Sequence, residues 1–446
     1  METQTRLFPS KNQLGPRTDG PTLQFTENGS FKITVFSDFH LAEDEEKDTK
    51  TQQVMDTILL KEDPQLVVLN GDLISGEAVQ ENTNTSAKID QILEPLVSRG
   101  IPWASTHGNH DSEIYLDPVQ IFRREKQYGG SLTRKMVSEP VAGVTNYYLL
   151  VYPNGEGSGN GDGNGNGQEE GEAPAMVLWF FDSRGGHWPR SRSNTEESVN
   201  RANWVDDSVI NWFTSTSKDL NTKYNRTLPS LAFFHIPVSE MLNYQTHHDP
   251  LPSPSSGIND ERVNQQGYGG GFDFDNQDSA FMRALAETEG LIATFSGHDH
   301  GNDWCMKWTL SNSNSNSNPN PNPNPNPNPN LNPDSEPSIT LCYDRHTGYG
   351  GYGSWDRGGR QILLQTSSTG VQSTGLDPGD QGQGRIPDAR TWVRLEDGTI
   401  TGEMNLSSSG GGTGPGVFAS TSGSGSCVVA VGGGGGEGVG TSRLGA

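Results

Sequence analysis

The amino-acid sequence predicts an α/β protein with one folded domain, and three observations support this prediction. Short apolar, β-branched segments alternate with segments of helical periodicity in the N-terminal part of the chain. Only 30% of the 446 residues are hydrophobic, and this deficit is concentrated in a few Gly-, Asn- and Pro-rich tracts. Clusters of Asp, Asn and His residues follow several of the predicted strands.

The alternation starts with three predicted strands and two predicted helices. The strands cover residues 31–37, 66–70 and 101–106, and turn residues bound them. Between them, apolar residues recur at helical spacing over 48–60 and 87–98. This order is typical of right-handed crossover units on a parallel sheet. Further strands are expected at 147–152, 176–182, 231–235, 291–296, 339–342, 361–365, 391–395 and 399–405, and helices at 199–213 and 278–287.

Four tracts lack the apolar residues that a core requires: 154–171, 311–333, 367–384 and 406–446. Apolar burial cannot offset the entropy of ordering such segments, and the alternating Pro residues of the second tract remove backbone donors. We therefore expect disordered low-complexity inserts and a disordered tail around one domain that spans residues 31–405. Residues 1–30 are expected to form an N-terminal extension.

Charge and hydropathy argue against several classes of protein. The chain has 31 Lys and Arg against 55 Asp and Glu, and the net charge of −24 opposes binding to nucleic acid. No segment approaches the roughly 20 apolar residues of a membrane span, and the N-terminus lacks a secretory pattern. We expect no nucleic-acid partner, no membrane span and a cytoplasmic location, with the vacuole or the cell exterior as alternatives. Three cysteines are too few for a disulfide scaffold, and the sequence leaves a pairing of Cys305 with Cys342 open.

Five polar clusters follow predicted strands. Because ligands of open α/β sheets gather beyond the carboxyl ends of the strands, these positions are the most informative for function. The clusters are DFH at 38–40, NGD at 70–72, GNHD at 108–111, the single His235, and GHDH at 297–300.

The donor types in these clusters indicate a metal site. Asp38 and His40 are two residues apart, as are His298 and His300, so in extended backbone each pair points to one side. Carboxylate, imidazole and amide oxygen donors suit Zn, Mn and Fe, whereas a soft-metal site would use thiolates. Seven donors exceed the needs of one tetrahedral ion and suit two ions bridged by a carboxylate. They are Asp38, His40, Asp72, Asn109, His235, His298 and His300.

The order DxH, GD, GNHD, H, GHxH resembles the calcineurin-like metallophosphoesterase superfamily over residues 38–300. The segment LCYDRHTGYGGYGSWDRGGR at 341–360, preceded by GHDHGNDWC, resembles the fungal and plant subgroup related to purple acid phosphatases. In that subgroup, Gly is expected where Asp344 stands. The resemblance implies a sandwich of two mixed β-sheets flanked by helices, with two metals at the sheet ends.

The resemblance also implies a role for each donor. Asp38, His40 and His300 would hold the first ion, whereas Asn109, His235 and His298 would hold the second. Asp72 would bridge them. Purple phosphatases have a Tyr three residues beyond the bridging Asp, and this chain has Ser75 there, so we expect no purple charge-transfer band. The identity of the two divalent or trivalent ions, among Fe, Zn and Mn, stays open.

The implied chemistry is attack by a metal-bound hydroxide on a phosphate ester. Asn109 and His110 are expected to contact the substrate. His110 is the expected proton donor to the leaving group, with Asp111 fixing its tautomer. Alternatively, His110 only forms a hydrogen bond to a ligand.

The Gly- and Tyr-rich segment after residue 343 offers a second set of substrate contacts. Arg345 and His346 are candidates, because Arg suits bidentate phosphate recognition. The alternative is a structural loop with solvated Arg side chains.

The function predicted first is hydrolysis of phosphate monoesters, on small molecules or phosphoproteins. Two alternatives remain. The same dimetal chemistry serves phosphodiesterases that act on nucleotides or lipid head groups, and a non-catalytic binding module can retain the fold.

Overall fold

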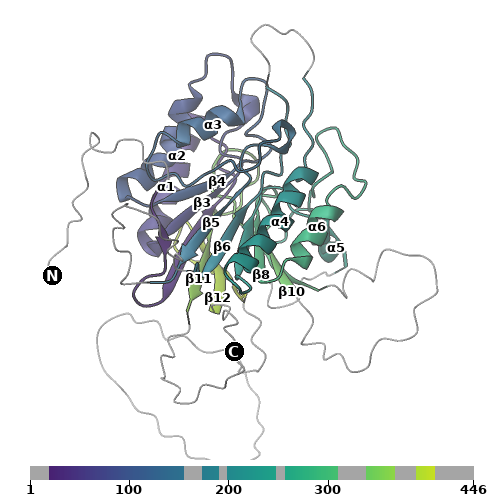
Figure 1. Ribbon diagram of the computed structural model, residues 1–446. Helices are drawn as coiled ribbons and strands as arrows, with labels where there is room; N and C mark the ends of the chain where they lie inside the picture. The colour runs from purple at the N-terminus through teal and green to yellow at the C-terminus, as the bar shows by residue number, and fades with distance from the viewer. Residues whose placement is uncertain are drawn as a thin grey trace, which may run out of the picture. The chain divides into compact units, whose positions relative to one another are not determined.

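The computed structural model describes residues 20–154, 173–189, 198–247, 257–309, 338–366 and 388–406 (Figure 1). The predicted inserts at 154–171, 311–333 and 367–384 and the tail at 406–446 lie outside the described residues, except for Asn154 and Leu406. Among the helices that are described, none combines the length and the apolar character needed to cross a bilayer.

One mixed sheet has the spatial order β13-β12-β11-β2-β3-β4 within the described residues. β2, β3 and β4 run parallel, with Val35 opposite Val68 and Val68 opposite Ala104. β11 pairs antiparallel with β2, and the hairpin of β12 and β13 extends the edge. The strands are β2 (Ser30–Phe36), β3 (Leu66–Asn70), β4 (Trp103–Thr106), β11 (Gly358–Gln365), β12 (Asp388–Leu395) and β13 (Ile400–Asn405).

The other mixed sheet has the order β1-β5-β6-β7-β8-β10-β9 in the same described ranges. β6, β7, β8 and β10 are parallel neighbours, whereas β5 and β9 pair antiparallel with β6 and β10. The strands are β1 (Leu23–Gln24), β5 (Tyr147–Tyr152), β6 (Met176–Phe180), β7 (Ser230–Phe233), β8 (Leu291–Ser296), β9 (Cys305–Thr309) and β10 (Ser338–Tyr343).

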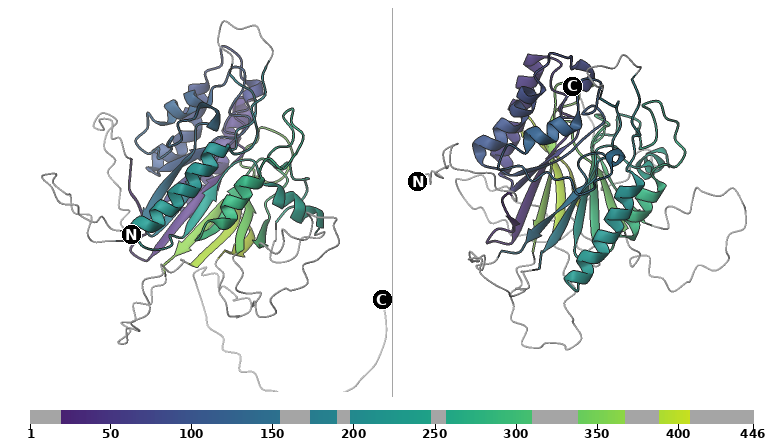
Figure 2. Two further views of the ribbon diagram at one scale, coloured as in Figure 1. Left: turned by 45° about the vertical axis from the view of Figure 1, so that its right-hand side comes forward. Right: turned by 45° about the horizontal axis from the view of Figure 1, so that its top comes forward.

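The two sheets pack face to face, and helices cover both outer faces (Figures 1 and 2). Side chains from both sheets, such as Ile33 and Phe233, share one buried cluster between the sheets. A second cluster joins α4, α5 and α6 to the sheet of β6 and β7, and a third joins α1, α2 and α3 to the sheet of β2 and β3. This arrangement confirms the sandwich that the resemblance implied. The helices are α1 (Glu45–Glu62), α2 (Thr85–Arg99), α3 (Pro118–Glu125), α4 (Asp207–Lys223), α5 (Ser239–His247) and α6 (Ser279–Glu287).

The helix predicted at 199–213 is displaced toward the C-terminus. α4 begins at Asp207, because the carboxylate of Asp206 accepts a hydrogen bond from the backbone N–H of Ser208 and caps the helix. The preceding residues are not helical, and Asn200 forms an isolated antiparallel bridge with His187. Arg201 donates its backbone N–H to Gly186 at 2.8 Å, so this segment pairs with a neighbouring loop.

Four elements were not predicted: β1, β9, α3 and α5. Strand β1 lies within the predicted N-terminal extension and pairs with β5, with Leu23 opposite Val151. Strand β9 is the antiparallel partner of β10, and a disulfide joins Cys305 of β9 to Cys342 of β10. The structure thus settles the pairing that the sequence left open.

Glu125, at the end of α3, is a buried carboxyl group that contacts β4 and is not one of the predicted ligands. Its Oε2 accepts hydrogen bonds from Ser105 and Thr133, both at 2.9 Å. Burial raises its pKa from 4.5 to about 7, in spite of these hydrogen bonds. Because the folded state binds its proton more tightly than the unfolded state does, the contribution of Glu125 to stability is greatest below about pH 4.5 and is lost as the pH rises through about 7.

Glu125→Gln should therefore flatten the pH dependence of stability. Between pH 5 and pH 8 the wild type is expected to lose about 2–4 kcal/mol of unfolding free energy that the variant retains. Thermal unfolding midpoints of both proteins at the two pH values measure this difference, and any constant effect of the substitution cancels. Equal shifts in the two proteins would contradict the prediction.

Candidate metal centre

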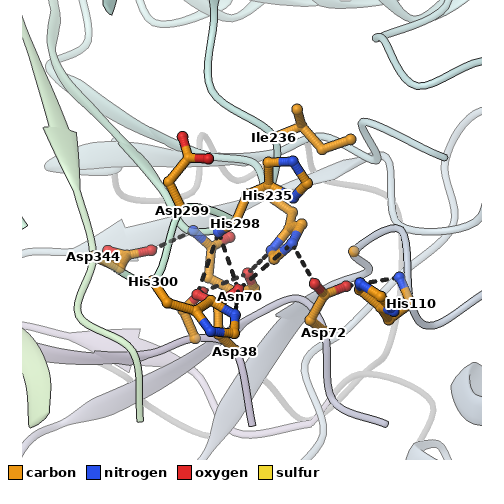
Figure 3. A network of polar contacts seen from close by, with 12 residues as sticks. Asp38, Asn70, Asp72, His110, His235, Ile236, His298, Asp299, His300 and Asp344 are labelled. Atoms are coloured by element: carbon orange, nitrogen blue, oxygen red, sulfur yellow. Dashed lines mark hydrogen bonds and ion pairs between the residues drawn. The ribbon is translucent and has the colours of Figure 1, made fainter. Parts of the chain in front are cut away.

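The five polar clusters meet where β2, β3, β4, β7 and β8 end, at the same edge of the two sheets (Figure 3). The chain turns sharply at these ends. Four of the predicted ligands have positive φ angles: Asp38 (57°), His40 (50°), Asp72 (50°) and His298 (80°). Non-glycine residues adopt this conformation at a cost of about 1–3 kcal/mol each, which the surrounding contacts must offset. This backbone conformation turns the chain within one or two residues, so that short loops direct these side chains toward a common centre.

Glycine permits the close approach of the loops. A Cβ atom at Gly108 would lie 2.2 Å from the Oδ1 atom of Asp72, and one at Gly71 would lie 2.4 Å from the Nδ1 atom of His235. Packing therefore requires both glycines, Gly108 against the carboxylate of Asp72 and Gly71 against the ring of His235.

Asp38, His40 and His300 form a first group of potential ligand atoms, all within 4.8 Å of one another. The Nε2 atoms of His40 and His300 are 3.1 Å apart, and the Nε2 of His300 lies 3.7 Å from the Oδ1 of Asp38. All three side chains are buried. Two imidazole nitrogens that face each other beside a carboxylate are suited to share one cation.

Asp72, His235 and His298 form a second group with the same spacing limit. The Nε2 of His235 lies 2.9 Å from the Oδ2 of Asp72. That same carboxylate oxygen is 3.7 Å from the Nε2 of His40 in the first group. Asp72 thus lies between the two groups, where a bridging carboxylate would have to be.

Asn109, the remaining predicted ligand, directly follows Gly108, whose backbone lies against Asp72. Its Oδ1 atom is buried without a hydrogen-bond partner among the described residues. A buried amide oxygen normally has a partner, and an unpaired acceptor costs about 1–3 kcal/mol. A metal ion would satisfy it. A Cβ atom at Gly185 would lie 2.6 Å from the Cβ of Asn109, so the loop after β6 packs closely against this residue.

Hydrogen bonds fix the orientation of three histidines. The Nδ1 of His235 donates to the backbone carbonyl of Asn70 at 2.8 Å, and the Nδ1 of His300 donates to that of Tyr352 at 3.0 Å. The Nδ1 of His40 lies 3.0 Å from the hydroxyl of Ser75. In each case Nδ1 is engaged, so Nε2 is directed at the groups described above.

The charges of the site are strongly coupled. Burial alone would raise the pKa of Asp72, but His235, His110 and His40 hold it well below its ordinary value. Burial would lower the pKa of His235, but the carboxylates of Asp72 and Asp38 raise it to about 10. Burial lowers the pKa of His298 to about 3. A metal ion would compete with a proton for His235, so metal binding there would release a proton.

His110 lies at the rim of the site, and its partner differs from the predicted one. Its Nδ1 is 2.7 Å from the Oε2 of Glu77, in the short helix η1 (Gly76–Ala78). Burial would lower the pKa of His110, but Asp72 and Glu77 raise it to about 9. Its ring packs edge-on against that of His40, with centroids 4.9 Å apart.

Asp111 was predicted to fix the tautomer of His110, and the structure corrects this. Its Oδ1 accepts hydrogen bonds from the backbone N–H groups of Leu73 and Ile74, and its Oδ2 accepts one from Gly108. Its carboxyl group therefore ties the loop after β3 to the loop after β4. Burial and the charge of Asp72 raise its pKa to about 7.

Arg345 and His346, the predicted substrate contacts, are both buried. The guanidinium group of Arg345 donates to the carboxylate of Asp303 at 2.7 Å and to the backbone carbonyl of Asp356 at 2.6 Å. These bonds favour the alternative of a structural loop, with a buried rather than a solvated Arg. The ring of His346 stacks on that of His300 at a centroid distance of 3.8 Å.

Asp344 stands where the resemblance led us to expect Gly, and it has a clear partner. Its Oδ2 accepts a hydrogen bond from the side-chain amide of Asn70 at 2.5 Å. Burial raises its pKa to about 7. The backbone carbonyl of Asn70 in turn accepts the hydrogen bond that orients His235. Asp344 therefore acts on His235 indirectly, by holding the side chain of Asn70.

An α/β sandwich with two groups of His and Asp side chains at its strand ends defines a class of phosphoesterases. The chain belongs to the calcineurin-like phosphoesterase family, whose model matches residues 31–302. This membership confirms the resemblance found from the sequence motifs. The family is dimetal-dependent, and the two groups of donors are candidate ligands here; His40, Asp72 and His110 form a third, overlapping group with the same spacing limit.

Relatives of known name include phosphatases of yeast and plants. The chain is 29% identical over 311 residues to phosphatase DCR2 of Saccharomyces cerevisiae, which covers 65% of this chain and 47% of that protein. It therefore spans about half the length of the yeast relative. It is 25% identical over 404 residues to probable inactive purple acid phosphatase 29 of Arabidopsis thaliana, covering 84% of this chain and 85% of that protein.

Two solved structures are similar to the chain at low sequence identity. A dimetal phosphatase from Danio rerio matches with a TM-score of 0.47 and 11% identity, covering 85% of this chain and 99% of that one. Purple acid phosphatase PPD1 from yellow lupin matches with a TM-score of 0.40 and 10% identity, covering 86% and 55%.

Proposed function

We propose that this protein hydrolyses phosphate monoesters with the help of two metal ions. The observation that carries the proposal is the position of Asp72, whose carboxylate lies between two groups of histidines that are buried except for the half-buried His298. We assign Asp38, His40 and His300 to one ion and Asn109, His235 and His298 to the other, with Asp72 between them. The catalytic domain is proposed to span residues 31–405, and strand β1 adds an edge to one of its sheets.

Two bound ions would supply positive charge for the phosphate oxygens and a water molecule of lowered pKa. The residues of the chain contribute the rest. His110, held by Glu77, is placed at the rim to donate a proton to the leaving oxygen. Asn109, next to it in the chain, offers a buried and unpaired amide oxygen.

The complete set of donors supports an active enzyme over a binding module. All seven predicted donors belong to the described residues, and the Oδ1 of Asn109 is free of other hydrogen bonds within that part of the chain and available to a ligand. The name of the yeast relative, a phosphatase, supports a monoester substrate. The names of the Arabidopsis relatives carry the word inactive, so turnover must be measured directly.

Removal and return of metal test the proposal. The purified full-length chain should contain about two metal ions, and a chelator should abolish hydrolysis of p-nitrophenyl phosphate. Re-addition of Zn²⁺, Mn²⁺ or Fe²⁺ should restore it. The bis-ester of the same phenol should be hydrolysed at least about tenfold more slowly. Faster bis-ester hydrolysis would favour a phosphodiesterase, and bound metal without turnover would favour a binding module.

A further inference from the structure

The ring of His300 is held between two other rings. It stacks on Tyr352 with centroids 4.0 Å apart and 10° between the planes, and on His346 with centroids 3.8 Å apart and 31° between the planes. Two rings cannot both stack this closely on one face without overlapping. Tyr352 and His346 therefore lie on opposite faces of His300 and restrict its rotation.

Tyr352 also holds His300 through polar contacts. Its backbone carbonyl accepts the hydrogen bond from the Nδ1 of His300, and its hydroxyl donates to the Oε1 of Glu261 at 2.6 Å. The other oxygen of Glu261 accepts a hydrogen bond from the backbone N–H of Gly301 at 2.9 Å. Tyr352 thus holds the imidazole of His300 directly and, through Glu261, the backbone of the next residue, Gly301.

Gly351, the residue before Tyr352, is linked to His40 of the first group through Glu43 and Ser75. The backbone N–H of Gly351 donates to the Oε1 of Glu43 at 2.8 Å, and the hydroxyl of Ser75 donates to the same oxygen at 2.7 Å. Since the hydroxyl hydrogen of Ser75 is used in this way, its oxygen accepts from the Nδ1 of His40. Gly351 and Tyr352 therefore orient His40 and His300 together.

The second group is oriented by other parts of the chain. The Nδ1 of His235 donates to Asn70 at the end of β3, and the backbone N–H of His298 donates to the carboxylate of Asp38. Neither contact involves Gly351 or Tyr352. Tyr352 does reach the second group through its hydroxyl, which lies 3.4 Å from the backbone carbonyl of His298. This contact does not involve the imidazole of His298, so the rings of the two groups are oriented by different contacts.

We propose that Gly351 and Tyr352, with His346 and the Glu43–Ser75 contact, form a positioning element for the first metal subsite alone. The inference rests on the ligand assignment in the proposed function. In this proposal the Gly- and Tyr-rich segment controls metal occupancy at Asp38, His40 and His300. It does not act as a loop that covers the substrate. Loss of this element weakens one metal subsite and spares the other.

Tyr352→Leu tests the element, because the side chain of Tyr352 is 48% exposed and its truncation leaves no buried cavity. Metal-depleted full-length protein is titrated with Zn²⁺ and the two dissociation constants are measured by calorimetry. The wild type should bind two ions. In the variant one ion should bind about tenfold to hundredfold more weakly while the other is unchanged. Tyr352→Phe, which retains the ring, should restore affinity to within about threefold.

Two further variants make the result decisive. Tyr115, which is 52% exposed, provides the matched control Tyr115→Leu. This variant should bind both Zn²⁺ ions with the dissociation constants of the wild type. Ser75→Ala removes the contact to His40 and should weaken the same single site, even if Tyr352→Leu does not fold. Wild-type affinities in both Tyr352→Leu and Ser75→Ala, or equal weakening of both sites, would overturn the inference. Fewer than two ions in the wild type would instead refute the ligand assignment of the proposed function.

Discussion

Asp72→Asn is expected to lower kcat/KM for phosphate esters by about 10³-fold or more, equivalent to roughly 4 kcal/mol of transition-state stabilisation. Asn has nearly the same shape and retains an acceptor for the backbone N–H of His110, which now donates to the Oδ1 of Asp72 at 2.8 Å. The substitution removes the negative charge and replaces the oxygen that faces both His40 and His235 by an amide NH2 group, which is not a metal ligand. Elemental analysis should show fewer than two ions per chain, because the shared ligand is lost.

The control for this variant is Asp219→Asn, at an exposed position of α4, which changes the net charge by the same amount. Its activity and metal content should match the wild type. Full activity with two ions in Asp72→Asn would mean that Asp72 does not bridge the centre, and the proposed function would lose its main support.

The polar clusters were predictable because their position depends on strand order. Parallel strands place their carboxyl ends at one edge of a sheet, so Asp38 after β2 and Asp72 after β3 had to be neighbours. The sandwich brings the ends of β7 and β8, with His235 and His298, to the same edge. The sequence motifs alone therefore predicted which side chains would meet.

The partners of these side chains were harder to predict. Asp111 follows His110 directly, yet its carboxylate turns to backbone N–H groups, whereas Glu77 reaches His110 from another loop. That contact depends on helix η1, where the backbone N–H of Gly76 donates to the carbonyl of His110 at 3.1 Å. Tyr352 is similar, because a loop without periodicity places it against His300. Loop conformation depends on many weak contacts, and the spacing of residues does not reveal it.

The start of α4 shows a third limit. Apolar residues at helical spacing extend back to Val199, so periodicity favoured an early start. The cap at Asp206 and the pairing of Arg201 with Gly186 determine the actual boundary. Tertiary pairing thus overrode local helix propensity.

His110→Asn is expected to reduce kcat by roughly 10²–10⁴-fold for alkyl phosphates and by much less for p-nitrophenyl phosphate. An alkoxide leaves only when it receives a proton, whereas p-nitrophenolate leaves without one. Metal content should stay near two ions per chain, because the seven proposed ligands are intact. Steady-state kinetics with a series of leaving groups measures the effect as a steeper dependence of kcat on leaving-group pKa. A loss of metal would favour the alternative that His110 only supports a ligand.

Glu77→Gln tests the contribution of the Glu77 carboxylate to proton donation while His110 itself is retained. The variant retains an amide at the position of the carboxylate but no longer supports the positive charge on His110, so kcat for alkyl phosphates should fall roughly tenfold to hundredfold.

The chain offers a matched pair in His187 and Glu113, whose Nδ1 and Oε2 atoms are 2.8 Å apart. His187 is about as exposed as His110, at 33% against 32% of the side chain, and lies outside the candidate ligand groups. His187→Asn and Glu113→Gln should leave the leaving-group dependence unchanged. If they alter it as much as the substitutions at His110 and Glu77 do, the proton donor is not specifically His110.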